Sequence, residues 1–223
     1  MSFANFCRFD KPLPYPEAVL LQKRLVEDRI ADRIPDTILL LQHPPVITLG
    51  RRGRANHLLA SKDQLKKQGV EITTSQRGGD VTFHGPGQWV LYPILKLGRG
   101  GLGAHGYLHS LEEIAIKTAQ ACGISAFRKE GMAGGWSEKG KFAATGFAFK
   151  KWVSWHGLSM NVMPDLSYFD LIVGCGLVGE KVTSFQEILG EECPEMDQVA
   201  EQIQRQCEEV LQRDCKPVDV KDL

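Results

Sequence analysis

Arg77-Gly-Gly-Asp-Val-Thr-Phe-His-Gly-Pro-Gly-Gln88 is the stretch that decides how this chain folds. Four glycines and a proline in twelve residues indicate a backbone held at special dihedral angles or closely approached by a ligand. Arg77 and His84 can donate hydrogen bonds to an anionic or carbonyl-bearing ligand. The alternative is a glycine-rich hairpin with a surface arginine and a packed histidine.

Two common phosphate-binding loops do not fit this stretch. It lacks the Gly-Lys-Ser/Thr sequence of a nucleoside-triphosphate P-loop. It also does not open a predicted helix after a strand, as a dinucleotide-binding fingerprint must.

Hydrophobic periodicity around the stretch predicts a mixture of helices and strands. Helical spacing predicts helices over 17–34, 61–68, 110–121 and 194–214, with Ser110 as the N-cap of the third. Alternating or β-branched runs predict an edge strand over 3–9 and further strands over 37–42, 46–49, 70–75, 88–95, 141–149 and 154–162. Because helices and strands do not alternate regularly, the expected fold class is α+β, with mixed β-sheets packed with helices.

Length and composition fit one globular domain over residues 1–223. Lys plus Arg (27) equals Asp plus Glu (27), so no basic field indicates a nucleic-acid partner. No apolar run approaches the ~18 residues of a membrane span, so no membrane partner is expected. Six scattered cysteines suggest neither a disulfide framework nor a zinc site. With no leader in evidence, a reducing cytoplasm is the expected location, and a mitochondrial or plastid matrix is the alternative for a eukaryotic source.

Cys175 stands out among the cysteines. It lies in Leu171-Ile-Val-Gly-Cys-Gly-Leu-Val-Gly179, where an apolar run predicts a strand or strand end and the glycines predict a turn. A turn lets a sulfur stand clear of packed elements with backbone N–H groups nearby, as a nucleophile requires. A buried loop cysteine with only a packing role is the competing interpretation.

The twelve-residue stretch, followed by Val90-Leu-Tyr-Pro-Ile94, closely resembles the signature of the lipoyl(octanoyl) transferases. Four further segments resemble the same family in the same order: Leu41–Gly50, Lys141-Phe-Ala-Ala-Thr-Gly146, Trp155–Val162, and Cys175-Gly with Val182-Thr-Ser184 behind it. The resemblance covers about Leu39 to Ser184, which is most of the chain.

The resemblance implies the α+β catalytic domain shared with lipoate–protein ligases and biotin ligases. It implies transfer of an octanoyl group from octanoyl-acyl carrier protein to a lysine of a lipoyl domain, the acceptors being 2-oxoacid dehydrogenase complexes and the glycine cleavage H protein. By position, Cys175 would carry the acyl thioester and Lys141 would activate it. The implied substrate-binding residues are Arg77, Gly78, Gly79, Asp80, Val81, Thr82, Phe83, His84, Ala144, Thr145, Gly146, Gly157, Leu158 and Ser159. One departure is Gly174, where the family is expected to have proline before the nucleophile.

The chemistry of these residues is consistent with that role. A thiol has a pKa of about 8.5, and a nearby ammonium such as that of Lys141 favours the thiolate. Thiolate attack on a thioester, followed by amine attack, requires no ATP, so we expect no cofactor and no metal. Oxyanion donors are expected from backbone N–H groups near Gly176 or Lys141, with help from His84.

The apolar slot for the acyl chain is expected around Phe142, Phe147 and Phe149, which are equally well explained as sheet core. His43 is interpreted as a hydrogen-bonded turn residue, His57 as a surface or packed residue, and His156 as a residue that orients the backbone. An ATP-dependent ligase and a non-catalytic module that binds lipoyl domains remain as alternatives. We expect a monomer.

Overall fold

The computed structural model describes residues 2–97, 103–173 and 180–223 of the chain. Cys175, Gly174 and Gly176 therefore lie outside the described residues. Within the described ranges no helix is long and apolar enough to cross a membrane.

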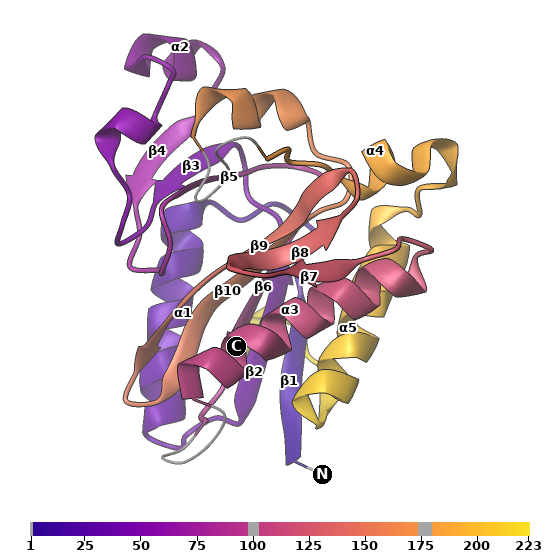
Figure 1. The fold of residues 1–223 in the computed structure, drawn as a ribbon. Helices are drawn as coiled ribbons and strands as arrows, with labels where there is room; N and C mark the ends of the chain where they lie inside the picture. Colours follow the sequence, from indigo (N-terminus) through magenta and orange to yellow (C-terminus); the bar gives the residue numbers. More distant parts are fainter. Residues whose placement is uncertain (1, 98–102, 174–179) are drawn as a thin grey trace.

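A mixed sheet of eight described strands forms the centre of the fold (Figure 1). In spatial order the strands are β11 (Arg213–Pro217), β1 (Ser2–Arg8), β2 (Asp36–Leu41), β6 (Gln88–Ile94), β10 (Val153–Asn161), β9 (Gly140–Lys150), β8 (Met132–Ser137) and β7 (Phe127–Lys129). β1 pairs in parallel with β11 and β2, and all other neighbours in this sheet are antiparallel. The mixed pairing confirms the predicted α+β class.

Helices cover both faces of this sheet. Figure 1 shows α1 (Tyr15–Ile30) behind it and α3 (Gly103–Ala121) in front, with α5 (Met196–Leu211) beside α3. The hydrophobic core on the α1 side of the sheet includes Leu25, Leu39 and Tyr92. The larger core on the other side includes Tyr107 and Ile203. The short helix α4 (Phe185–Leu189) buries Phe185 in this larger core.

A second sheet of three strands lies beside the first and is ordered β4 (Glu71–Thr74), β3 (Val46–Leu49), β5 (Val81–His84). Its own core joins Ile47 and Phe83 to Leu65 of α2 (Lys62–Lys67). This helix lies within the predicted range 61–68, and Ser61 is its N-cap, with a complete capping box to Gln64. The glycine-rich stretch is therefore not a simple hairpin, because β5 belongs to the small sheet and β6 to the large one.

Three local predictions are wrong. The strand over 3–9 is not an edge, because the C-terminal strand β11 pairs along it. Ser110 is not an N-cap but lies inside α3, where its hydroxyl donates to the Gly106 carbonyl; the helix begins seven residues earlier, at Gly103. Within the described residues the apolar run 171–173 belongs to no strand, since Leu171 ends a 3₁₀ helix (Leu166–Leu171) and Ile172 forms an isolated bridge with Leu58.

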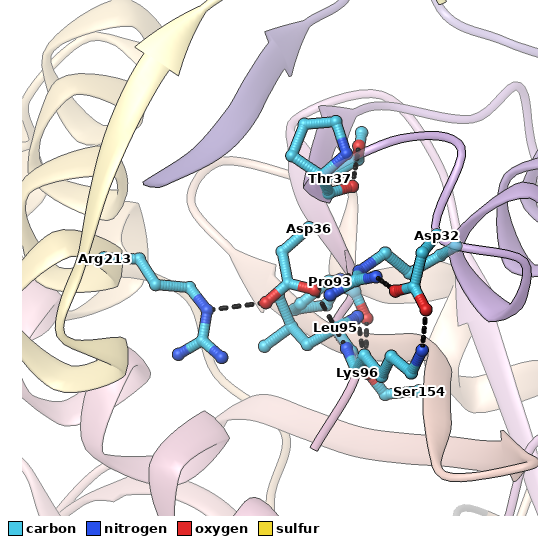
Figure 2. A network of polar contacts seen from close by, with 10 residues as sticks. Asp32, Asp36, Thr37, Pro93, Leu95, Lys96, Ser154 and Arg213 are labelled. Carbon is cyan, nitrogen blue, oxygen red and sulfur yellow. Dashed lines mark hydrogen bonds and ion pairs between the residues drawn. The ribbon is translucent and has the colours of Figure 1, made fainter. Parts of the chain in front are cut away.

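The buried carboxylate of Asp36 links the ends of several helices and strands by hydrogen bonds. Asp36, at the start of β2, is only 6% exposed and accepts hydrogen bonds from Arg29 Nε (2.6 Å), Arg213 Nε (2.7 Å) and the Lys96 backbone N–H (2.9 Å) (Figure 2). Asp32 belongs to the same network, because its carboxylate accepts hydrogen bonds from Arg29 Nη1 and from Lys96 Nζ. A buried charge is tolerated when it is paired and hydrogen-bonded, so this network joins α1, β2 and β11 at the edge of the core.

Candidate active site

A cavity of about 570 Å³ lies where the two sheets meet. Its walls come from the glycine-rich stretch and from β6, β9 and β10. The antiparallel register places Gly146 opposite Gly157, Thr145 opposite Leu158 and Ala144 opposite Ser159. Two segments that are separate in sequence therefore form one wall. A volume of this size is typical of sites for small molecules.

The residues that the resemblance implied for substrate binding gather around this cavity. The members that line it are Arg77, Gly78, Gly79, Asp80, Val81, Thr82, His84, Ala144, Thr145, Gly146, Gly157, Leu158 and Ser159. Phe83 is the exception: it is 1% exposed and stacks on Tyr168 in the core of the small sheet, with 4.6 Å between ring centroids. Because side chains alternate along a strand, Phe83 faces away from Thr82 and His84.

Arg77 holds the loop together from inside. Its Nη2 donates to the Thr48 carbonyl (2.6 Å) and the Asp80 carbonyl (2.8 Å), its Nη1 to the Gly78 carbonyl (3.0 Å), and its Nε to Thr48 Oγ1 (3.1 Å). The side chain is almost fully buried. Its guanidinium thus fixes the backbone that lines the cavity and places a positive charge beneath it.

Glycines let this loop lie directly against β9. The Gly78 N–H donates to the Phe147 carbonyl at 2.9 Å. A Cβ on Gly146 would stand 2.9 Å from the Gly78 carbonyl oxygen, which is too close for two packed backbones. The glycine content of the stretch therefore reflects close backbone approach, as its sequence indicated.

Asp80 also stabilises the loop. It accepts a hydrogen bond from His57 Nδ1 at 2.5 Å and one from the Arg54 backbone N–H at 3.3 Å. This pairing secures the turn after β3 and agrees with the structural interpretation of His57.

Lys141 enters the cavity from β9. Its Nζ lies 5.5 Å from the centroid of the Trp136 ring, and its half-buried side chain passes over Gly134. Its backbone N–H donates to the Lys181 carbonyl at 2.8 Å, and its carbonyl accepts from the Thr183 N–H at 2.9 Å. The Lys181 carbonyl therefore occupies the Lys141 N–H itself, and the expectation of an oxyanion donor among the backbone N–H groups near Gly176 or Lys141 stays a prediction.

The chain on either side of Cys175 reaches the same cavity. Ile172 and Val182 both line it, and Val182 bridges to Lys141. Among the three phenylalanines expected around the acyl chain, only Phe147 lines the cavity. Phe142 packs on Phe185 in the core instead.

A cluster of five aromatic rings is formed by Tyr15, His43, His84, Tyr92 and His156, and all of them except His43 line the cavity. Neighbouring rings lie 5.2 to 6.1 Å apart. His43 Nε2 lies 2.8 Å from the Tyr92 hydroxyl. These residues come from four distant segments, so sequence spacing gave no sign of the cluster.

His156 has an unusual environment. It adopts φ of +56°, and neither ring nitrogen has a partner in the described part of the chain. Its backbone N–H donates to Gln22 Oε1 at 2.8 Å, so Gln22 orients this backbone rather than His156 orienting its neighbours. Burial is the main cause that lowers the pKa of His156 to about 3.

The buried histidines predict a pH-dependent stability. Burial lowers the pKa of His43 from 6.5 to about 4, so the unfolded state binds a proton that the folded state does not. The free energy of unfolding should fall as pH drops from about 6.5 towards 4, by at most about 1.4 kcal/mol per pH unit for each such histidine. Urea midpoints measured across that range should show a smaller pH slope for His43→Gln than for wild type. The exposed His109, replaced by Gln, serves as the control, and an unchanged slope in His43→Gln would contradict the assignment.

Among the residues that the structure describes, no group of three or more His, Cys, Asp or Glu side chains could hold a metal ion. The cavity instead offers one ammonium, several neutral rings and many backbone groups.

Comparison with known proteins gives a consistent result. The family described as the lipoyl protein ligase A/B catalytic domain matches residues 14–208. A protein of Syntrophotalea carbinolica named octanoyltransferase is 45% identical over 179 residues, which is 80% of this chain and 82% of that protein. Another of that name from Chloroflexus aurantiacus is 43% identical over 202 residues, covering 89% and 90%.

Solved structures show the same fold at low sequence identity. A bi-partite lipoate protein ligase from Thermoplasma acidophilum superposes with a TM-score of 0.75 at 14% identity, covering 99% of this chain and 88% of that one. Lipoate-protein ligase A bound with ATP gives 0.74 at 14% identity, with 99% and 90% covered.

Proposed function

This chain belongs to the lipoyl protein ligase A/B catalytic domain family, and from that premise we propose that it is an acyltransferase that carries an octanoyl group to lipoyl domains. The proposed donor is octanoyl-acyl carrier protein, and the acceptors are lysines of the lipoyl domains of 2-oxoacid dehydrogenase complexes and of the glycine cleavage H protein. One domain, acting as a monomer, would perform both steps.

The observation that carries this proposal is the single cavity shared by Lys141, the Arg77–His84 loop and the chain on both sides of Cys175. Cys175 is three residues beyond Ile172, and three residues span at most about 11 Å. Ile172 and Val182, which precede and follow Cys175 in the sequence, both line the cavity. This arrangement supports Cys175 as the residue that carries the acyl group.

The proposed chemistry has two steps. The Cys175 thiolate attacks the donor thioester and gives an acyl-enzyme of similar energy. The acceptor amine then attacks this second thioester, and formation of the amide drives the reaction forward. Lys141 would favour the Cys175 thiolate by its charge and would then donate a proton to the departing thiolate of the carrier, which leaves as a thiol.

The apolar part of the cavity suits an acyl chain. Leu108, Met132, Trp136 and Phe147 line it together with Val182. Each methylene buried there contributes about 0.8 kcal/mol to binding. Four residues of the ring cluster, Tyr15, His84, Tyr92 and His156, line the same cavity and offer polar groups to the reacting amine and carbonyl.

An ATP-free transfer assay tests the proposal against a ligase. Purified protein is mixed with octanoyl-acyl carrier protein and an unmodified lipoyl domain, without ATP, and the mass of the lipoyl domain is followed. We expect addition of one octanoyl group to its acceptor lysine. Modification that occurs only with ATP and free acid would show a ligase, and no modification under either condition would favour a binding module.

A further inference from the structure

A chain of buried hydrogen bonds leads from His84 to the backbone next to Lys141. His84 Nδ1 lies 2.7 Å from Gln88 Oε1, Gln88 Nε2 donates to Asn161 Oδ1 at 2.8 Å, and Asn161 Nδ2 donates to the Thr183 carbonyl at 3.0 Å. The side chains of His84, Gln88 and Asn161 are at most 5% exposed. The next link joins the Thr183 N–H to the carbonyl of Lys141.

The Thr183 carbonyl, at the last of these hydrogen bonds, fixes which group donates in each of the others. A backbone carbonyl can only accept, so Asn161 must present its NH₂ group to Thr183 and its oxygen to Gln88. Gln88 must therefore present its NH₂ group to Asn161. The Phe83 carbonyl confirms this independently, because it accepts from the same Gln88 Nε2 at 3.2 Å. Gln88 Oε1 is then an acceptor, and His84 Nδ1 must carry a proton.

The other ring nitrogen of His84 is the one left for the cavity. This atom, Nε2, has no hydrogen-bond partner in the described part of the chain. Unlike the ring nitrogens of His156, it is not fully buried. His84 lines the cavity, as Lys141 does. Burial, with smaller contributions from His43, Arg77 and His156, lowers the pKa of His84 well below its ordinary value. The ring is therefore neutral near pH 7, and Nε2 holds a lone pair.

We propose that His84 Nε2 accepts a proton from the acceptor lysine in the second half-reaction. The inference rests on the proposed function and names a group that would receive the proton which the amine loses. It also withdraws His84 as an oxyanion donor, since Nε2 carries no hydrogen. The two half-reactions would then use different groups: Lys141 gives up a proton in the first, and the imidazole of His84 accepts one in the second.

The balance of the step is simple. The amine nitrogen forms a bond to the acyl carbon, the C–S bond breaks, and its electron pair returns to the Cys175 sulfur. The proton leaves the nitrogen for Nε2 and passes on to the thiolate, which restores a neutral imidazole and a thiol. A weakly basic imidazole suffices, because the nitrogen becomes strongly acidic once it is bonded to the acyl carbon. The positive charge of Arg77 nearby also disfavours an ammonium and so favours the reactive neutral amine.

Single-turnover kinetics separate the two halves of the reaction. Wild type and His84→Asn are first loaded from octanoyl-acyl carrier protein, and the loaded enzyme is then mixed with a lipoyl domain. Asparagine retains a donor for Gln88 Oε1 but has no group at the position of Nε2. We expect loading within about threefold of wild type and discharge at least about 100-fold slower. His84→Gln, whose amide reaches towards the Nε2 position, should give an intermediate discharge rate.

The outcomes distinguish this inference from the function on which it rests. If wild type does not load, the proposed function fails. If it loads and His84→Asn discharges at the wild-type rate, or if both half-reactions slow equally, the inference about His84 is wrong. Nitrogen-15 NMR of histidine-labelled wild type provides a test that needs no variant to fold well, with the signal assigned by its loss in His84→Gln. A proton on Nδ1 alone is expected, and a proton on Nε2 would overturn the proposal.

Discussion

Replacing Cys175 by alanine should reduce octanoyl transfer by about 10⁴-fold or more, because the variant has no sulfur to carry the acyl group. The rate is measured as octanoyl appearing on a lipoyl domain without ATP. A ligase of the same fold, in which an activated acid is attacked directly by the amine, would keep its activity in this variant.

Cys193→Ala is the matched control for that experiment. Cys193 is half-buried, lies between α4 and α5, and does not line the cavity. Its replacement should leave transfer within about twofold of wild type, as is usual for substitutions away from a site. Full transfer by Cys175→Ala, with the control unchanged, would rule out the acyl-enzyme route.

Replacing Lys141 by alanine should have the second largest effect. Removal of the ammonium should slow transfer by about 100-fold or more and raise the pKa of the Cys175 thiol towards the ordinary value of about 8.5. The pKa is measured from the rate of alkylation of Cys175 across a pH series. Lys141→Arg keeps the positive charge but releases a proton much less readily, so we expect a thiol pKa near wild type with slow transfer.

Lys139→Ala provides the control for charge alone. Lys139 lies two residues before Lys141, and its Nζ donates to the carbonyls of Glu187 and Ile188 outside the cavity. Its removal should change neither the alkylation profile nor the transfer rate. An alkylation profile that is identical in wild type and Lys141→Ala would remove Lys141 from the activating role.

Much of the fold could be predicted from local sequence signals. The strands predicted over 141–149 and 154–162 and the short helix predicted over 61–68 are visible without tertiary information, and the structure confirms them as β9, β10 and α2. The strands β5, β7, β8 and β11 were not predicted, and β8 and β11 illustrate the reason. β8 reads Met-Ala-Gly-Gly-Trp-Ser, and β11 contains charged residues and a proline, so neither has a strand pattern of its own. Pairing with neighbours stabilises them, and sequence periodicity does not report pairing.

Ser110 shows how a local rule can be overridden. Serine with glutamate three residues later is a good N-cap sequence, yet α3 extends back to Gly103. The added first turns carry Tyr107, whose side chain is fully buried in the core. Tertiary burial decided the boundary.

Many of the residues that line the cavity could be named from the sequence, but their contacts could not. The glycine-rich stretch identified the cavity wall, yet Arg77 proves to hold the loop from inside. The proton position on His84 depends on carbonyls of Phe83 and Thr183, whose positions follow only from the folded chain. The ring cluster depends on contacts between distant segments in the same way.

Intact-mass analysis of the enzyme itself tests the central claim most directly. Wild type is mixed with octanoyl-acyl carrier protein in the absence of a lipoyl domain, and peptide mapping then locates any added mass. We predict one octanoyl group, on Cys175, that is lost when an unmodified lipoyl domain is added. No adduct, or an adduct on another residue that transfers with the same rate, would contradict the account.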